Sequence, residues 1–396
     1  MKILFVSLFL PQEKSYHAGG RYVFEIIRGL SLRHEIHLIT RLEKSELPLL
    51  GSLRPFCSAI HPYTYSTTQG RKNLLSLAAL GLNYLGFSRY ADRMASSGNF
   101  DLIQVEWVDA AVMMKRRNTP MALTAHDVLT KPAERRMRSG MGLRKLLNSL
   151  IFLFIRTLEL RIMKRFDMVF TLSEFDRQYI LAMDADVRAG VMPYPAGLDI
   201  TERAYERQEN SILFLASYKY LRRNVEAALY FYNEVFPRVR KVIPEARFIA
   251  AGYGPPADLT ALQEMDPAVS VPGFVDDLDE CYKRAHVFAA PILVGGGIIV
   301  KILDAMASGT PVVTTTYGNE GIGAVPGRDI LIADGPESFA DAVVRVLSDR
   351  ELAAGLSLNG REFVRKHFTF EAAMKNLEAA YEKIIKGRKE AVNSKK

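Results

Sequence analysis

Three consecutive glycines, at positions 295 to 297, run directly into an apolar segment that contains one lysine and one aspartate, Lys301 and Asp304. Backbone without side chains lets a ligand approach closely, and the unpaired N–H groups at the start of a helix favour an anion. Lys301 adds a positive charge, and the Asp304 carboxylate can accept hydrogen bonds from hydroxyl groups. These residue types in this order fit a nucleotide diphosphate, with its phosphates on the glycines and the lysine and its ribose on the aspartate.

A structural interpretation of the same segment stays open. Ile299, Ile302, Leu303 and Met306 are spaced i, i+3, i+4 and i+7, which predicts a helix over residues 298–308 with its apolar face on a sheet. The glycines would then only permit close packing, and a Lys–Asp surface pair would contribute roughly a few tenths of a kcal/mol. Neither a GxGxxG fingerprint nor a GK[ST] phosphate loop occurs, so the glycine triplet alone does not decide between the two.

The elements that must position these residues alternate between strand and helix along the whole chain. Strands are expected at residues 2–7, 35–40, 102–107, 121–127, 167–173, 212–217, 246–252, 269–275, 287–293, 311–315 and 329–334. Helices are expected between them, among them 224–240 and 298–308, and at 336–348, 351–366 and 370–385. Such alternation predicts the α/β class, with parallel sheets covered by helices on both faces. We expect two doubly wound, Rossmann-like domains that face each other across a cleft, joined near residues 193–210.

Composition limits the class of protein. The chain has 396 residues and only two cysteines, Cys57 and Cys281, whose separation excludes a disulfide scaffold and a zinc site. The apolar N-terminus is followed by a proline and charged residues with no cleavage site, so it reads as a strand and not as a secretion signal. The apolar runs at residues 74–87 and 146–155 are too short to span a bilayer. We therefore expect a cytoplasmic protein.

Positive charge is concentrated in one stretch. Residues 131–166 contain ten Lys/Arg and two Glu, interleaved with Leu, Ile and Phe. This pattern is typical of a solvated helical face, and also of an amphipathic segment that rests on anionic lipid; both interpretations stay open. Nucleic acid is not expected as a partner, because no binding motif and no regular series of aromatic residues accompanies the charge.

Several segments resemble a known family. The stretch GGGIIVKILDAMASGTPVVTT (295–315), GNEG (318–321) and residues 327–347 resemble the C-terminal domain of group 1 glycosyltransferases, which are retaining enzymes with the GT-B fold. The glycine–lysine segment is similar to the subset whose donor loop reads GxGxxxKxxEAM. Residues 9–40, 214–255 and 269–292 are similar to further βαβ units of the family. The resemblance spans nearly the whole chain.

The resemblance implies a domain organisation and a set of site residues. It places an N-terminal acceptor-binding domain at 1–195, a C-terminal nucleotide-sugar-binding domain at 196–368, and a last helix that crosses back to the N-terminal domain, with a basic tail, at 369–396. It assigns catalytic roles to His126, near the transferred sugar, to Lys301 and to Arg223. The other donor-binding residues that it implies are Gly19, Gly20, Arg222, Gly295, Gly296, Gly297, Ile298, Asp304 and Glu320. The alignment leaves open which of the two arginines contacts the phosphate.

The function implied is transfer of a sugar from a nucleotide-diphosphate sugar to a glycan or lipid-linked acceptor, in bacterial surface polysaccharide or exopolysaccharide synthesis. The family needs neither a metal nor a cofactor, and its members often act at the inner face of the cell membrane. Two positions depart from the family pattern: Gly296 replaces its first glutamate and Asp304 its second. A nucleotide-sugar 2-epimerase and a nucleotide-sugar-binding protein without turnover therefore stay open as alternatives. A double Rossmann dehydrogenase is disfavoured, because no GxGxxG follows the first strand.

Overall fold

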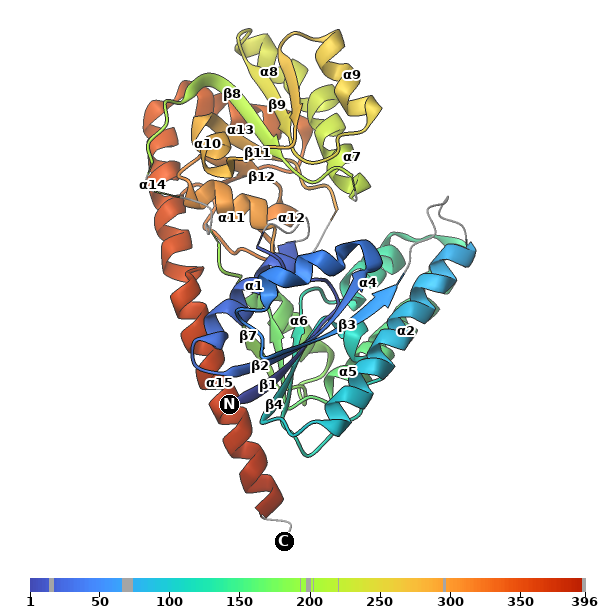
Figure 1. The fold of residues 1–396 in the computed structure, drawn as a ribbon. Coiled ribbons are helices and arrows are strands. Elements are labelled where there is room, and N and C mark those ends of the chain that lie inside the picture. Colours follow the sequence, from blue (N-terminus) through green and yellow to red (C-terminus); the bar gives the residue numbers. More distant parts are fainter. Residues whose placement is uncertain are drawn as a thin grey trace. The chain divides into compact units, whose positions relative to one another are not determined.

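The computed structural model describes residues 1–13, 18–65, 74–192, 194–196, 201, 203–219, 221–294 and 297–393. It divides into two compact units. Unit 1 comprises Met1–Pro193 and Ala373–Lys396, and unit 2 comprises Tyr194–Ala372. Each unit is an α/β domain built on its own parallel sheet (Figure 1).

The sheet of unit 1 has seven parallel strands in the order β3-β2-β1-β4-β5-β6-β7. The strands are β1 Lys2–Ser7, β2 Glu35–Glu43, β3 Ala59–Tyr65, β4 Leu102–Glu106, β5 Met121–Ala125, β6 Met168–Thr171 and β7 Ala189–Val191. The five strands predicted here are confirmed. The two edge strands were not predicted: β3 has no fully buried residue and contains Pro62, and β7 is only three residues long. The order in which the chain adds strands to the sheet reverses between β1 and β4. In folds of this kind, ligands bind beside such a reversal.

Unit 2 repeats the same arrangement with six strands in the order β10-β9-β8-β11-β12-β13. The strands are β8 Gln208–Leu215, β9 Arg247–Ala251, β10 Val269–Gly273, β11 Ala285–Ala290, β12 Val312–Thr314 and β13 Leu331–Ile332. All six were predicted, within a few residues at each end. Here the strand order reverses between β8 and β11, which pair in parallel.

Helices connect the strands in both units. In unit 1 they are α1 Ala18–Ser31, α2 Leu74–Ser97, α3 Val108–Ala111, α4 Thr130–Ser139, α5 Gly142–Met163 and α6 Glu174–Met183, with a 3-10 segment at Lys44–Leu53. In unit 2 they are α7 Arg222–Tyr230, α8 Phe236–Val242, α9 Ala257–Met265, α10 Leu278–Arg284, α11 Val300–Ala307, α12 Thr316–Asn319, α13 Pro336–Ser348 and α14 Arg350–His367. The last helix is α15, Phe370–Asn393.

The helix predicted over residues 224–240 is confirmed, with one π-helical turn inside it. The structure has α7, then a π-helical turn at Phe231–Val235, then α8. Pro237 explains the interruption, because it lies in the first turn of α8 and has no N–H to continue the α-helical hydrogen bonds of the preceding turn.

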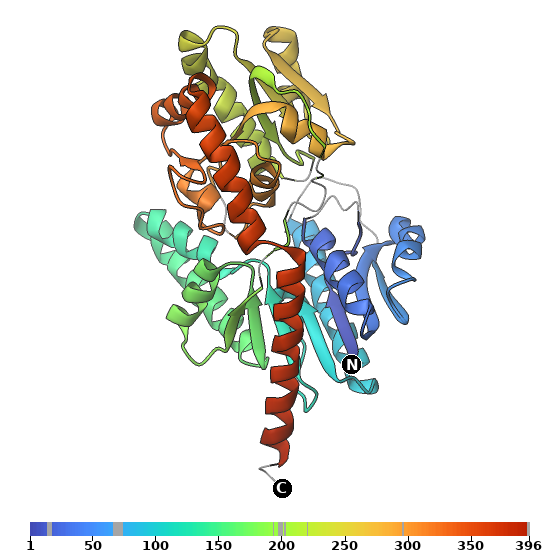
Figure 2. The ribbon, with the colours of Figure 1, turned by 90° about the vertical axis from the view of Figure 1, so that its left-hand side faces the viewer.

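The last helix packs on unit 1 through polar contacts as well as apolar ones. Tyr381 is fully buried and its hydroxyl donates a 2.8 Å hydrogen bond to the Oε1 atom of Gln104 on β4. Glu378 forms ion pairs with Arg33, at 2.6 Å, and with His34, at 3.1 Å. Figure 2 shows this helix running along unit 1. Residues from the two ends of the chain therefore stabilise the same domain.

The hydroxyl of Tyr381 is expected to stabilise unit 1. Tyr381→Phe keeps the ring but leaves the buried Gln104 amide oxygen without its donor, which should cost about 1–3 kcal/mol. Urea unfolding followed by the fluorescence of Trp107, the single tryptophan of the chain and a residue of unit 1, measures the change. Tyr90→Phe is the control, because the Tyr90 hydroxyl has no hydrogen-bond partner among the described residues. Equal unfolding midpoints for the two variants would contradict the assignment.

Candidate active site

Two helices of unit 2 begin beside the reversal of strand order in its sheet. Strands β8 and β11 are neighbours, and α7 and α11 are the helices that follow them. Because the strands are parallel, both helices start at the same edge of the sheet. Their unpaired N–H groups and the positive ends of their dipoles favour an anion at this edge.

Lys301 occupies the first turn of α11 and reaches toward the start of α7. Its Nζ atom donates a 3.2 Å hydrogen bond to Oδ1 of Asn224, and it lies over the ring of Phe214 at 4.7 Å from the centroid. Asn224 is itself fixed, because its Nδ2 donates to the carbonyl of Ser217 at 2.7 Å. The apolar face predicted for this helix is confirmed: Ile302, Leu303 and Met306 are all buried.

The charge of Lys301 is not balanced within the part of the chain that the structure describes. No carboxylate there forms an ion pair with Lys301. Burial, together with the positive charge of Arg223, lowers the pKa of Lys301 to about 7. A lysine kept in an apolar setting beside a second cation gains most from a ligand that brings negative charge.

The structure separates the two arginines that the sequence left as equal candidates. Arg222 forms an ion pair with Asp258 at 3.1 Å and approaches Glu226 at 3.8 Å, so carboxylates already balance its charge. Arg223 forms no ion pair with any described residue and acts electrostatically on Lys301. Arg223 is therefore the better candidate for contact with an anion.

Gly297, the described residue of the glycine triplet, precedes α11 and contacts Gly321 of the GNEG segment. Gly295 and Gly296 lie outside the described residues. Gly297 has a φ of +74°, a conformation that favours glycine. A Cβ atom on Gly321 would lie 2.3 Å from the Gly297 carbonyl oxygen, so only glycine allows these two segments to meet.

This contact brings Glu320 to the same part of unit 2. Glu320 immediately precedes Gly321 and caps the short helix α12. Ile298 packs against the core of unit 2, and Asp304 lies half-buried one turn after Lys301. Unit 2 thus gathers Arg223, Gly297, Lys301, Asp304 and Glu320 around the start of α11.

A buried hydroxyl at the same edge was not anticipated from the sequence. The Oγ atom of Ser217 is buried and has no hydrogen-bond partner among the described residues. Ser217 lies in the loop between β8 and α7 and, through its carbonyl, holds Asn224. Buried polar groups are normally satisfied, so an unpaired hydroxyl here is consistent with a position completed by a ligand.

His126 lies at the corresponding edge of unit 1, directly after β5. Its Nε2 atom is 2.7 Å from Oε2 of Glu106 at the end of β4, and both side chains are buried. The other Glu106 oxygen accepts hydrogen bonds from Gln104, at 2.9 Å, and from Thr124, at 3.2 Å. Gln104 in turn accepts from Tyr381. A buried network therefore fixes the orientation of the imidazole.

Trp107 completes the surroundings of His126. The two rings stack with centroids 4.0 Å apart and an angle of 10° between their planes. Trp107 has a φ of +73°, which is uncommon for a bulky residue and costs conformational energy. Tyr22 of α1 meets the imidazole edge-on at 5.2 Å. The strained tryptophan and the tyrosine enclose the histidine ring on two sides.

Gly19 and Gly20 are the glycines of unit 1 that the resemblance implied in donor binding. Both belong to the first turn of α1, which begins at Ala18. N–H groups in the first turn have no intrahelical partner in any helix, so glycine is tolerated there. The apolar face of the helix, which includes Tyr22, Val23 and Ile26, is buried and anchors the turn.

Several residues of these two sites were missed, although the sequence contains signals for them. Gln104 and Glu106 are two residues apart on one strand, so their side chains point to the same face. Asn224 follows the two arginines at the start of a predicted helix. Tyr381 could not be found in this way, because its partner Gln104 is 277 residues away in the sequence.

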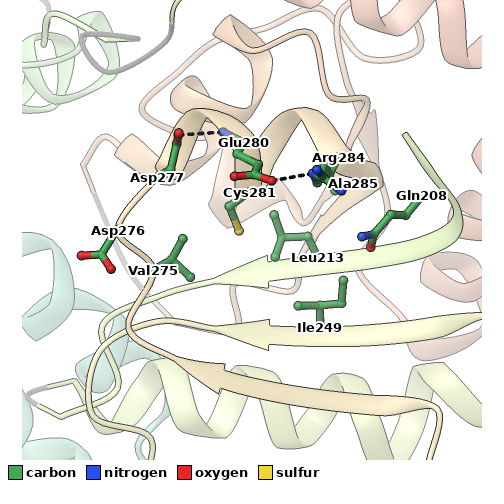
Figure 3. A pocket seen from close by; sticks show the side chains of 10 residues that line it. All are labelled: Gln208, Leu213, Ile249, Val275, Asp276, Asp277, Glu280, Cys281, Arg284 and Ala285. Atoms are coloured by element: carbon green, nitrogen blue, oxygen red, sulfur yellow. Dashed lines mark hydrogen bonds and ion pairs between the residues drawn. The ribbon is translucent and has the colours of Figure 1, made fainter. Parts of the chain in front are cut away.

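A cavity of about 400 Å³ in unit 2 lies outside this constellation (Figure 3). Its lining includes Leu213 and Ile249 from the sheet and Cys281 from α10. The carboxylate of Asp277, another lining residue, caps α10 by accepting a hydrogen bond from the Glu280 N–H at 2.9 Å. Burial raises the pKa of the Cys281 thiol to about 12, so it is not a nucleophile at neutral pH. None of the predicted site residues lines this cavity.

Comparison with protein families gives one match in each unit. Residues 19–193 match glycosyltransferase family 4, and residues 209–349 match the family described as glycosyl transferases group 1. A protein of 44.6 kDa from the cps region of Klebsiella pneumoniae is 24% identical over 168 residues, which cover 40% of this chain and 42% of that protein. The lipopolysaccharide core biosynthesis mannosyltransferase LpsB of Rhizobium meliloti is 27% identical over 156 residues, 36% of this chain and 44% of LpsB. The chain thus spans less than half the length of these relatives.

Solved structures share the fold over almost the whole chain. Sucrose-phosphate synthase from Thermosynechococcus elongatus superposes with a TM-score of 0.72 at 17% identity, covering 98% of this chain and all of that chain. The Anabaena protein HepE in complex with UDP-glucose gives a TM-score of 0.65 at 14% identity, with 97% and 100% coverage. Two parallel α/β domains with these neighbours define the GT-B architecture. The chain thus consists of a glycosyltransferase family 4 domain followed by a group 1 glycosyltransferase domain. The narrower GxGxxxKxxEAM subset stays a prediction.

The pKa of Lys301 can be measured without a substrate. An exposed lysine titrates near 10.4, whereas Lys301 should become reactive to acetic anhydride, as the neutral amine, with a midpoint at about pH 7. Peptide mass spectrometry across a pH series gives this midpoint. Arg223→Gln should shift it upward, because a neighbouring positive charge is removed, and Arg222→Gln should not, because Asp258 balances that arginine. A midpoint near 10 in the unaltered protein would contradict the site.

Proposed function

We propose that the protein is a retaining glycosyltransferase, which moves a sugar from a nucleotide-diphosphate sugar to a glycan or lipid-linked acceptor. The observation that carries the proposal is Lys301: a half-buried lysine without a carboxylate partner among the described residues, beside Arg223 and at the start of two helices. A diphosphate supplies the negative charge that this arrangement lacks. HepE, a protein of the same fold, has been solved in complex with UDP-glucose, and this supports a donor of the same class.

The residues of unit 2 would act on the leaving group. When the bond between the sugar carbon and the phosphate oxygen breaks, negative charge grows on the diphosphate. Lys301, Arg223 and the helix N–H groups stabilise that charge because they are oriented before the reaction begins. Asp304 would bind the ribose hydroxyls. The acceptor oxygen forms the new bond to the sugar, and the departing phosphate oxygen takes its proton.

In unit 1, His126 would contact the transferred sugar. Its imidazole cannot rotate freely, because Glu106 holds one nitrogen and Trp107 stacks on the ring. We assign Glu106 the role of a positioning residue, which acts through the histidine. The relatives from a cps region and from lipopolysaccharide core synthesis support a glycan or glycolipid acceptor in surface polysaccharide synthesis.

A thermal-shift screen against UDP-, GDP-, ADP-, CMP- and dTDP-sugars tests the donor site. At a hundred times its dissociation constant, the correct donor should add about 2.7 kcal/mol of stability. Lys301→Ala should abolish the shift, and Lys241→Ala, which removes an exposed lysine of α8, should leave it unchanged. No shift with any donor, or an equal shift in both variants, would contradict the proposal.

Product analysis then separates glycosyl transfer from its alternatives. A transferase consumes the donor when an acceptor is present and joins the sugar to that acceptor. A 2-epimerase would convert the donor without any acceptor. Donor binding with no turnover under either condition would support a nucleotide-sugar-binding protein, the alternative that the loss of the first family glutamate at Gly296 favours.

We also propose that α5 rests on an anionic membrane surface. Large apolar side chains are exposed along this helix and just before it: Met141, Leu143, Leu146, Leu147, Leu150, Ile151, Leu153 and Phe154. Exposed cations accompany them: Arg136, Arg144, Lys145 and Arg161. No described helix is long and apolar enough to cross a membrane. A helix with this surface composition binds at the lipid–water interface.

Part of the basic stretch 131–166 serves the fold instead. Lys131 is buried and pairs with Asp176 at 2.7 Å. Arg156 donates to the carbonyl of Met183, and Arg165 to the carbonyls of Val112 and Met114. Fewer than the ten cations of this stretch are therefore available to face a lipid surface.

Vesicle co-sedimentation tests this contact. Binding to vesicles that contain phosphatidylglycerol should weaken as salt is raised, because the attraction is partly electrostatic. Leu143→Asp should weaken it by about tenfold, since it removes a side chain whose burial contributes roughly 1.5–3 kcal/mol. Leu32→Asp is the matched control, because both leucines are 83% exposed and belong to unit 1. Equal binding of the two variants would refute the contact and leave the face to a protein partner.

A further inference from the structure

A second cavity of unit 2 has a strongly basic lining. Its volume is about 470 Å³, within the usual range for small-ligand sites. Five cationic side chains line it: Arg203, Arg207, Lys283, Arg361 and Arg365. None of the lining residues that the structure describes is a carboxylate.

The cavity lies at the edge of the sheet opposite to the candidate active site. Arg207 precedes β8, and Lys283 lies just before β11, so both are at the amino ends of their strands. Ser308, another lining residue, is at the end of α11, whereas Lys301 is in its first turn. A helix of eight residues is about 12 Å long, which separates the cavity from the Lys301 site.

Neighbouring carboxylates account for only two of the five cations. Lys283 pairs with Asp279 at 2.9 Å, and Arg203 lies in the field of Asp277 and Asp279. Arg207, Arg361 and Arg365 form no ion pair with any residue that the structure describes. Three guanidinium groups around one cavity therefore leave an excess of positive charge.

Two of these guanidinium groups are held against the backbone. Arg207 donates a 2.6 Å hydrogen bond to the carbonyl of Gly309, and Arg361 donates to the carbonyl of Ser308 at 3.3 Å. A Cβ atom on Gly309, whose φ is +76°, would lie 2.6 Å from Nη2 of Arg361. Glycine at this position thus leaves room for the guanidinium, and the local backbone fixes its place before any ligand arrives.

Helix capping explains part of this arrangement but not all of it. Cations near the C-terminus of α11 stabilise its last carbonyls, which accounts for one arginine or both. It does not account for Arg365, which is exposed and has no polar partner among the described residues. Placing two guanidinium groups together is also unfavourable: burial and the charge of Arg361 lower the pKa of Arg207. A bound anion would remove this repulsion.

We propose that this cavity binds a ligand with two or more phosphoryl charges, at a site separate from the donor site. Guanidinium groups match phosphate oxygens in planar, two-pronged hydrogen bonds, and three of them around one cavity exceed what a single charge requires. The volume accommodates a diphosphate with an organic group attached. Tyr205 and Phe368 line the cavity as well and offer apolar surface to that group.

Calorimetric titration with inorganic pyrophosphate tests the proposal. The starting protein is the Lys301→Ala variant, so that binding at the donor site does not contribute. Arg365→Glu in that background should weaken pyrophosphate binding by about tenfold or more, because a charge is reversed in the lining. Lys366→Glu is the matched control: it makes the same charge change at the next, equally exposed residue of α14, which does not line the cavity.

The two substitutions are at exposed positions, and thermal unfolding of each variant verifies that it is folded. The result expected is a large loss with Arg365→Glu and less than a twofold change with Lys366→Glu. Equal losses in the two variants would show a general charge effect and overturn the site. Absence of pyrophosphate binding to Lys301→Ala would overturn it too. Citrate binding as tightly as pyrophosphate would refute the selectivity for phosphoryl groups.

A second arm identifies the source of the phosphoryl groups. The same pair of variants is co-sedimented with vesicles that contain phosphatidic acid. A loss of vesicle binding in Arg365→Glu alone, together with the loss of pyrophosphate binding, supports a phosphorylated lipid. Unchanged vesicle binding with loss of pyrophosphate binding supports a soluble phosphorylated compound.

Discussion

The candidate site of unit 2 depends on one amine, that of Lys301, which pairs with no carboxylate among the described residues. Lys301 is held by one amide oxygen and one aromatic face, both neutral, and Arg223 opposes its charge. A fold that only needed stability would place an acid beside this lysine, or an apolar residue in its position. Other features meet at the same edge of the sheet: the starts of α7 and α11, the contact between Gly297 and Gly321, and the Ser217 hydroxyl, which has no hydrogen-bond partner among the described residues.

Unit 1 follows a different principle, in which rigidity and not charge is the main feature. His126 is fixed by Glu106 and stacked on a strained Trp107, and the network extends to Tyr381 on the last helix. Because α15 supplies that tyrosine, the end of the chain contributes to the environment of a residue near the middle of unit 1. Buried polar networks of this kind specify one geometry when every member is satisfied.

The sequence predicted the strands and the main helices because apolar runs in parallel sheets are distinctive. It failed where the local signal was weak: edge strand β3 has no fully buried residue and contains Pro62, and edge strand β7 is only three residues long. At the site, residue type and order were enough to select Lys301. They could not choose between Arg222 and Arg223, since that depends on Asp258, which lies 36 residues beyond Arg222. Partners that distant are brought together only by the fold.

The proposed donor site requires that Lys301, which with a pKa of about 7 is mostly neutral in the free protein at pH 8, becomes charged when a diphosphate binds. Titration calorimetry at pH 8, with a nucleotide-diphosphate sugar in buffers of different ionisation enthalpy, counts the protons taken up. With a free pKa of about 7, the account predicts an uptake close to one proton, and none in Lys301→Ala. Binding with no proton uptake in the unaltered protein would contradict it.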